Sequence, residues 1–323
     1  MSNESLSRSV SPLAAWSQLV RLPNVFTVMA DVGAAFLLVA HGPFPIGRFA
    51  LVLLAGMKLY WAGMILNDVF DVESDTRERP TRPIPAGDIP LAQAKLVGWF
   101  LLFSGIMAAT VSGFLPSDQF EVTWLPGLVA MVLAVMVVLY DGPLKKTPLA
   151  PAAMGSCRVL SFLLGASPCI AFVVGESLFP KHVLFLAIGF GVYITGITTM
   201  ARREAVGGRS VNLLTGFIVT LVGMGIIAFG PSLSGEPAAW RIDPQRDYPL
   251  LVGLISLPVA LRALRIQASP TPANIQNAIR TGILSIIPLA AAVALLGAGR
   301  VWAIAVFALV VPAIVLAKRL RVT

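Results

Sequence analysis

The chain consists of long apolar stretches separated by short polar connections. Most stretches approach or exceed the roughly 20 residues that an α-helix needs to cross the hydrocarbon core of a membrane. Because backbone groups in lipid must be hydrogen-bonded within their own segment, each stretch is expected to be helical. The predicted segments cover residues 20–40, 48–68, 91–115, 122–140, 149–175, 181–200, 210–230, 248–266, 278–297 and 301–317. The pattern therefore predicts an all-α, polytopic membrane bundle.

The composition agrees with a membrane protein and excludes an ordinary soluble domain. Hydrophobic residues make up 57% of the 323 residues, charged residues only 12%, and the mean hydropathy is +0.83. Soluble domains carry roughly 25% charged residues. The opening residues 1–13 are polar and rich in serine, so we expect a disordered cytoplasmic tail ahead of one membrane domain over residues 14–323.

The basic residues are distributed unevenly between the two sides of the predicted bundle. The formal net charge is +8, and most of the 24 lysines and arginines fall on the side of the N-terminus. Cytoplasmic connections of membrane proteins carry this excess. The asymmetry predicts an integral membrane protein, in the plasma (inner) membrane, with both termini cytoplasmic, and argues against nucleic acid as a partner.

An acidic motif closes the second apolar segment. Asp68, Asp71 and Asp75 follow one another at i, i+3 and i+7, which places them on one face if the helix continues. Together with the amide of Asn67 they form an all-oxygen set, which suits hard cations such as Mg²⁺. We predict that Asn67, Asp68, Asp71 and Asp75 bind Mg²⁺.

Arginines follow this motif directly, at Arg79 and Arg82. Carboxylates, a metal and guanidinium groups at a membrane surface together favour a diphosphate ligand. The alternative interpretation is a charged helix end that contacts only solvent.

Ionisable residues also lie inside the predicted segments. Asp31 and Lys58 are each about ten residues from the cytoplasmic end of their segment, or roughly 15 Å deep. A buried charge is costly unless it is paired. We expect an Asp31–Lys58 ion pair, with contact to a ligand, or no contact at all, as the alternatives. For Arg158 we expect a phosphate contact, with a cation reaching back to the interface as the alternative.

The acidic motif and its arginines resemble the first signature of the UbiA superfamily of intramembrane prenyltransferases. Residues 19–24 are similar to that family's approach to its first helix, and the order of segments agrees through the ninth. The resemblance implies nine helices around a central cavity, and the tenth segment here is additional, so nine to ten are expected. It also implies Mg²⁺-dependent transfer of a prenyl group from a prenyl diphosphate to an aromatic or other lipophilic acceptor. The enzyme would thus transfer an alkyl group other than methyl.

The resemblance assigns roles to individual residues. It implies that Asp68, Asp71, Tyr140 and Lys145 are catalytic. The residues that we predict to bind the substrate are Arg79, Arg82, Arg158, Arg202, Arg203 and Glu204.

The second acidic signature of the family is depleted in this chain. It should fall near residues 200–208, where Glu204 is the only carboxylate and Arg202 and Arg203 share its turn. Two guanidinium groups in that place are expected to contact phosphate oxygens directly. This pattern resembles the divergent EboC-like branch of the superfamily.

Two other functions are compatible with these residues. A lipid-binding, metabolite-binding or transport-accessory membrane protein would keep the bundle and lose turnover, as the depleted second signature suggests. A transporter is less compatible, because the charges cluster on one side and symmetric broken helices are not evident.

Overall fold

The computed structural model describes residues 11–171, 177–202, 211–235 and 238–320. Residues 1–10 of the predicted disordered tail lie outside the described residues. Ser11 caps the first helix by accepting a hydrogen bond from the Ala14 amide at 3.3 Å. The predicted boundary at residue 13 therefore lies inside a helix.

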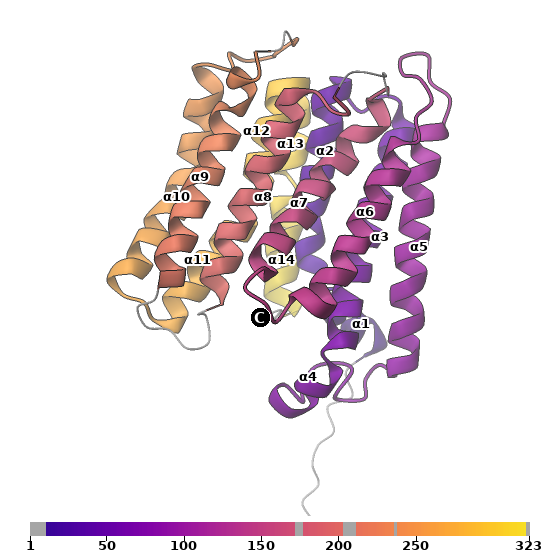
Figure 1. Ribbon diagram of the computed structural model, residues 1–323, viewed down its shortest axis with the longest axis vertical. Helices are drawn as coiled ribbons and strands as arrows, with labels where there is room; N and C mark the ends of the chain where they lie inside the picture. The colour runs from indigo at the N-terminus through magenta and orange to yellow at the C-terminus, as the bar shows by residue number, and fades with distance from the viewer. Residues whose placement is uncertain (1–10, 172–176, 203–210, 236–237, 321–323) are drawn as a thin grey trace, which may run out of the picture.

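The described residues form a bundle of roughly aligned helices (Figure 1). In chain order, the helices are α1 Pro12–Leu19, η1 Leu22–Asn24, α2 Val25–Ala40, α3 Ile46–Phe70, α4 Val72–Glu78, α5 Leu91–Phe114, α6 Leu125–Leu139, η2 Tyr140–Leu144, α7 Ala150–Ala166, η3 Ser167–Cys169, α8 Lys181–Ala201, α9 Val211–Leu233, α10 Asp247–Ala268, α11 Pro272–Leu284, α12 Ile286–Ala298, α13 Arg300–Phe307 and α14 Val310–Leu320.

The predicted transmembrane segments are confirmed as helical, except that the segment predicted over 149–175 is helical only over 150–169 within the described residues. Within the described part of the chain, 9 helical stretches are long and apolar enough to cross a membrane. Two of them are interrupted, because α11 and α12 share one span, as do α13 and α14. Helix α7, with 17 residues, lies among the long helices and corresponds to the remaining predicted segment. The prediction of nine to ten spanning helices is therefore correct.

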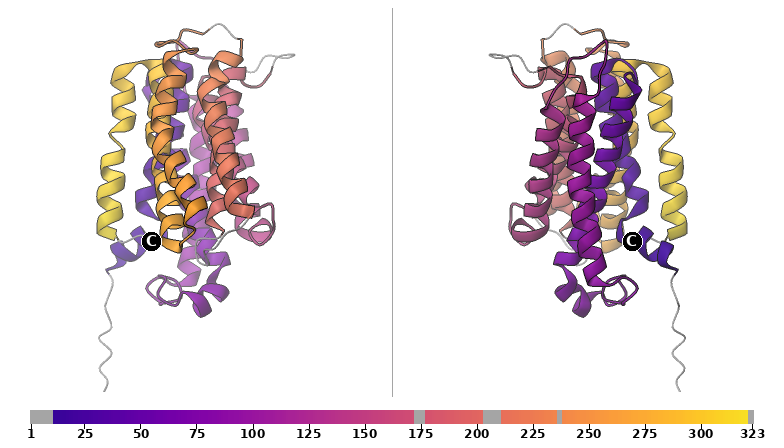
Figure 2. Two further views of the ribbon diagram at one scale, coloured as in Figure 1. Left: turned by 90° about the vertical axis from the view of Figure 1, so that its left-hand side faces the viewer. Right: turned by 90° about the vertical axis from the view of Figure 1, so that its right-hand side faces the viewer.

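Helix α2 lies inside the bundle and packs against α3, α7 and α12. Close approach to α7 depends on Gly165, where an added Cβ would lie 2.2 Å from the carbonyl oxygen of Val32. Helices α13 and α14, at the C-terminal end of the chain, run along one side of the bundle (Figure 2). Their span is only 11% buried, so most of its surface is available to lipid.

Helix α4 and the connection after it extend beyond one end of the spanning helices (Figure 1). A small apolar cluster anchors this region, in which Leu19 of α1 and Ile65 of α3 pack with Ile84 and Ile89 of the connection. The connection also folds back on itself, with the Ile89 amide donating to the Pro83 carbonyl at 3.2 Å. The segment after the acidic motif is thereby held against the end of α3.

Candidate functional site

The acidic motif spans the end of α3 and the start of α4. Asn67 and Asp68 are buried in the last turns of α3, and Asp75 is buried on α4. The backbone keeps a helical path between the two helices, because the amide of Asp71 donates to the Asn67 carbonyl at 3.0 Å. This continuity explains why the carboxylates remain close together, as their spacing predicts.

Arg82 joins two of these carboxylates. Its Nη1 lies 3.2 Å from Oδ1 of Asp68 and 2.5 Å from Oδ2 of Asp75. Arg21, which precedes η1, lies on the other side, with its Nη2 3.8 Å from the same Asp68 oxygen. The Asp68 carboxylate is 8% exposed and the Arg82 side chain 21%, so water screens this ion pair less than a surface pair, whereas Arg21 is 36% exposed.

The second half of the site comes from the end of α6. Residues 140–144 form a π-helical turn that contains Pro143, which has no amide hydrogen to donate. This turn directs Asp141 to Asn67, whose Nδ2 donates to Asp141 Oδ1 at 2.8 Å. Just beyond the turn, Lys145 forms an ion pair with Asp71. The predicted Lys145 therefore does meet the acidic motif, and Tyr140 begins the turn that positions it.

Asp141 is a site residue that our sequence reasoning did not single out. It is 4% exposed, and its Oδ2 atom has no hydrogen-bond partner within the described residues. Arg21 was also missed. The available signals were the position of Asp141 directly after Tyr140 and that of Arg21 in the segment before the first spanning helix.

The other predicted substrate-binding residues are more scattered. Arg79 is exposed and forms no ion pair with a described residue. Arg202 is exposed at the end of α8 and donates to the Thr147 carbonyl at 3.2 Å, two residues beyond Lys145. Arg203 and Glu204 lie outside the described residues.

The predicted Asp31–Lys58 ion pair is wrong, because Asp31 binds Arg158. Nη1 of Arg158 on α7 lies 2.5 Å from Oδ2 of Asp31 on α2, and Ser161 donates to the other carboxylate oxygen at 3.4 Å. Asp31 is completely buried. The pairing follows from the close packing of α2 and α7, and it commits the Arg158 guanidinium to a protein carboxylate. A phosphate contact of Arg158 stays a prediction.

The carboxylates are held in pairs with cations. Within the described residues, no three His, Cys, Asp or Glu side chains are grouped so that they could hold one metal ion. Arg82 binds Asp68 and Asp75, whereas Lys145 binds Asp71. The oxygen-rich donor set nevertheless has the chemistry that suits Mg²⁺, which proteins often bind through one or two carboxylates together with substrate phosphates.

Comparisons with known proteins identify the family and the fold of this chain. The digeranylgeranylglyceryl phosphate synthase of Methanobrevibacter smithii is 36% identical over 278 residues, which cover 83% of this chain and 93% of the relative. The solved structure of a digeranylgeranylglyceryl phosphate synthase matches with a TM-score of 0.63 at 18% identity, over 90% of this chain and 99% of that one.

A further solved structure is that of a UbiA homologue from Archaeoglobus fulgidus bound to DMAPP and Mg²⁺. It has a TM-score of 0.55 and 16% identity, and covers 91% of this chain and 99% of its own. At this identity both structural matches establish the fold. The profile of the UbiA prenyltransferase family matches residues 26–274. This chain therefore belongs to the UbiA prenyltransferase family.

Proposed function

We propose that this protein transfers a prenyl group from a prenyl diphosphate to a lipophilic acceptor, with Mg²⁺, at the cytoplasmic side of the membrane. The observation that carries the proposal is the meeting of the acidic motif with the end of α6. Asn67 binds Asp141 and Asp71 binds Lys145, so carboxylates and a cation from two spanning helices converge at one end of the bundle.

The relatives support both substrate and metal. The Archaeoglobus fulgidus homologue binds DMAPP and Mg²⁺, and the Methanobrevibacter smithii relative is a digeranylgeranylglyceryl phosphate synthase. An isoprenoid acceptor that carries a phosphate headgroup is therefore one acceptor class to test beside aromatic ones.

The metal ligands in this proposal come from the predicted Asn67, Asp68, Asp71 and Asp75 and the additional Asp141. One or two of these carboxylates would hold Mg²⁺ together with the diphosphate. Asp141 fits because a buried carboxylate oxygen without a partner is costly and is a ready ligand for a cation. Bound Mg²⁺ would neutralise negative charge that develops on the departing diphosphate.

The basic residues around the motif would bind the diphosphate. Lys145 and Arg82 already neutralise carboxylates at the end of α3, and each can turn to a phosphate oxygen when a ligand enters. Arg202 reaches the same loop as Lys145. Fixed cations of this kind stabilise a leaving group without reorganisation during the reaction. The apolar helices around the site would keep water from the allylic cation.

The test is an assay of the detergent-purified chain with Mg²⁺, a set of prenyl diphosphates and both classes of acceptor. We expect product from the wild type and at least a hundredfold lower turnover in Asp68→Ala and Asp71→Ala. Asp88→Ala is the control, because Asp88 is an exposed carboxylate in the connection between α4 and α5. Full activity in both variants would refute the proposal.

A second candidate function, binding without turnover, is favoured by one observation. The end of α8 brings the cation of Arg202 to the loop that follows Lys145, whereas a second metal would need a second set of carboxylates there. Mg²⁺-dependent binding of a prenyl diphosphate with no product after prolonged incubation with either acceptor class would select this alternative.

A further inference from the structure

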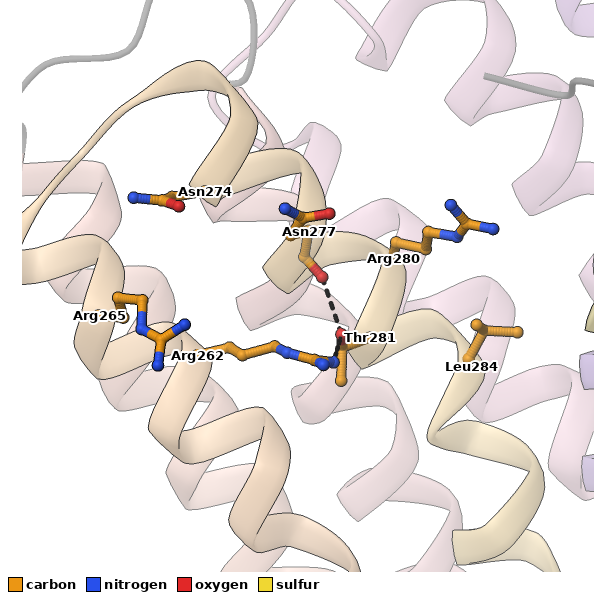
Figure 3. Close-up of a pocket in the computed structure, with 7 residues that line it drawn as sticks. All are labelled: Arg262, Arg265, Asn274, Asn277, Arg280, Thr281 and Leu284. Carbon is orange, nitrogen blue, oxygen red and sulfur yellow. Dashed lines mark hydrogen bonds between the residues drawn. The ribbon is translucent and has the colours of Figure 1, made fainter.

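A second polar site lies between α10 and α11, away from the acidic motif. A cavity of about 410 Å³ opens there, lined by Arg262, Arg265, Arg280, Asn274, Asn277 and Thr281. Figure 3 shows Arg262 and Arg265 extending from α10 toward α11, and Arg280 projecting from α11 itself. Three arginines from two helices thus line one cavity.

Within the described residues, no carboxylate pairs with the arginines of this cavity. None of its lining residues is acidic. Arg262 donates to the hydroxyl oxygen of Thr281, which itself donates to the Asn277 carbonyl at 2.8 Å. The sequence from Tyr248 to Thr323 contains no Asp or Glu at all. The cavity is therefore suited to an anion supplied from outside.

An apolar stripe along α10 runs toward the cavity. Leu250, Leu254, Leu257 and Leu261 recur at helical spacing and are each more than half exposed, between 51% and 64%. Arg265 follows Leu261 by four residues, so it continues the same stripe one turn further on. In a spanning helix these leucines contact lipid chains, and the stripe ends at the arginines.

The cavity lies at the end of the bundle where α4 and the C-terminus also lie (Figure 1). This is the end that the distribution of basic residues assigns to the cytoplasm. Anionic phospholipids of the cytoplasmic leaflet place phosphates at this depth. Guanidinium groups bind phosphate with paired, charge-assisted hydrogen bonds.

We propose that the cavity between α10 and α11 binds the phosphate headgroup of an anionic lipid, whose acyl chains lie along the leucine stripe. The positive-inside preference alone explains basic residues at this end of the helices. It does not explain why they share a cavity with hydrogen-bonding Asn and Thr side chains at the end of an exposed leucine stripe. The proposal is independent of prenyl transfer, because the cavity contains none of the residues of the acidic site.

The test measures lipid retained by the full-length protein in detergent, by native mass spectrometry after titration with phosphatidylglycerol or phosphatidylcholine. We expect the wild type to retain phosphatidylglycerol in preference to phosphatidylcholine. The triple variant Arg262→Gln/Arg265→Gln/Arg280→Gln should bind phosphatidylglycerol roughly tenfold more weakly or worse. Equal retention of both lipids by the wild type, or unchanged binding by the triple variant, would overturn the proposal.

A matched control removes the same number of charges at the same end of the bundle. Lys95, Lys318 and Arg319 are exposed and lie outside the cavity, so their combined replacement by Gln should change binding by less than about twofold. An equal loss in this control would also overturn the proposal, because it would show that net charge alone attracts the lipid.

Further variants separate folding from binding and identify the source of the phosphate. Arg265→Lys keeps the charge but not the paired geometry, so its phosphatidylglycerol affinity should lie between those of the wild type and Arg265→Gln. Comparable affinity of Arg265→Gln and wild type, at an unchanged melting temperature, would count against the site.

Glycerol phosphate serves as a soluble competitor. If glycerol phosphate displaces the lipid only at millimolar concentrations, the site binds a lipid with its acyl chains. Displacement at micromolar concentrations would show that the acyl chains are not needed for binding, and would overturn the proposal.

Discussion

At the scale of single residues, the candidate site pairs almost every buried charge with an opposite one. Asp68 and Asp75 share Arg82, and Asp71 binds Lys145. Asp141 differs, because one of its oxygens accepts from Asn67 and the other has no partner within the described residues. Such a group costs stability unless a ligand completes it, which makes Asp141 the residue whose role is most open to test.

Replacement of Asp141 by Asn should separate ligand binding from folding. Asn keeps the shape but removes the negative charge, so Mg²⁺-dependent affinity for an unreactive prenyl diphosphate analogue should fall by roughly tenfold or more. The melting temperature of the free protein should stay the same or rise, because a buried charge that forms no ion pair with a described residue is lost. Calorimetric titration at several Mg²⁺ concentrations measures the first effect. Asp88→Asn is the control, and equal losses in both variants would contradict the assignment.

The Asp31–Arg158 pair should be strongly coupled. Removing either partner leaves a charge in the membrane interior, so Asp31→Asn or Arg158→Met should each lower the free energy of unfolding by about 3–5 kcal/mol. The double variant should recover much of this loss, and Lys58→Met should have a smaller effect. Unfolding of the purified variants in detergent checks the cycle. Additive single effects would show that the pair carries no interaction energy.

The carboxylates of the motif and Arg82 were predictable as neighbours because their contacts are local in sequence, whereas Arg21 and Asp141 contact the motif from distant segments. The i, i+3 and i+7 spacing placed Asp68 near Asp75, and Arg82 lies only a short connection further on. The partner of Asp31 was not predictable from depth alone, since Lys58 and Arg158 lie at similar distances from the cytoplasmic end. The packing of α2 against α7 decides between them, and the sequence pattern of a helix that is apolar on every face does not reveal this packing.

At the scale of elements, the number and length of the helices followed from the thickness of a membrane, but their interruptions did not. The span Pro272–Ala298 breaks at Ser285, and α6 ends in the π-helical turn with Pro143. Hydrophobicity continues through Ser285, so an apolar window passes over that break. The predicted segment did end at residue 140, but the pattern did not indicate that the chain continues there as a π-helical turn. The turn after α6 matters for the site because it directs Asp141 toward α3.

Glycines let α8 and α9 pack closely, as small residues do between membrane helices. An added Cβ on Gly223 would lie 2.4 Å from the Tyr193 amide nitrogen, whereas Gly225 has open space around it. Gly223→Ala should therefore destabilise the protein by about 1–3 kcal/mol. Gly225→Ala should stabilise it by about 0.5–1 kcal/mol, because alanine restricts the unfolded chain. Melting temperatures compare the two, and a shift of the same sign in both would refute the packing argument.

At the scale of the whole molecule, family and fold were predictable because the motif, the segment order and the charge asymmetry all agree. The position of the site at one end of the bundle also followed, since α4 extends beyond the spanning helices there. The identity of the acceptor depends on the shape of the space between helices, which sequence patterns do not encode. The resemblance to the EboC-like branch stays a prediction.

The side of the membrane on which the acidic site lies can be determined by cysteine labelling. Asp118, in the connection between α5 and α6, and Glu78, at the end of α4, are exposed at opposite ends of the bundle. The two native cysteines are not exposed, so the parent chain should label weakly. In intact cells, a membrane-impermeant maleimide should label Asp118→Cys, and it should label Glu78→Cys only after permeabilisation. This outcome follows from the excess of basic residues at the end that carries α4, since the translocation of positive charge is disfavoured. The reverse labelling pattern would place the carboxylates outside the cell. It would then separate them from diphosphates that are made in the cytoplasm.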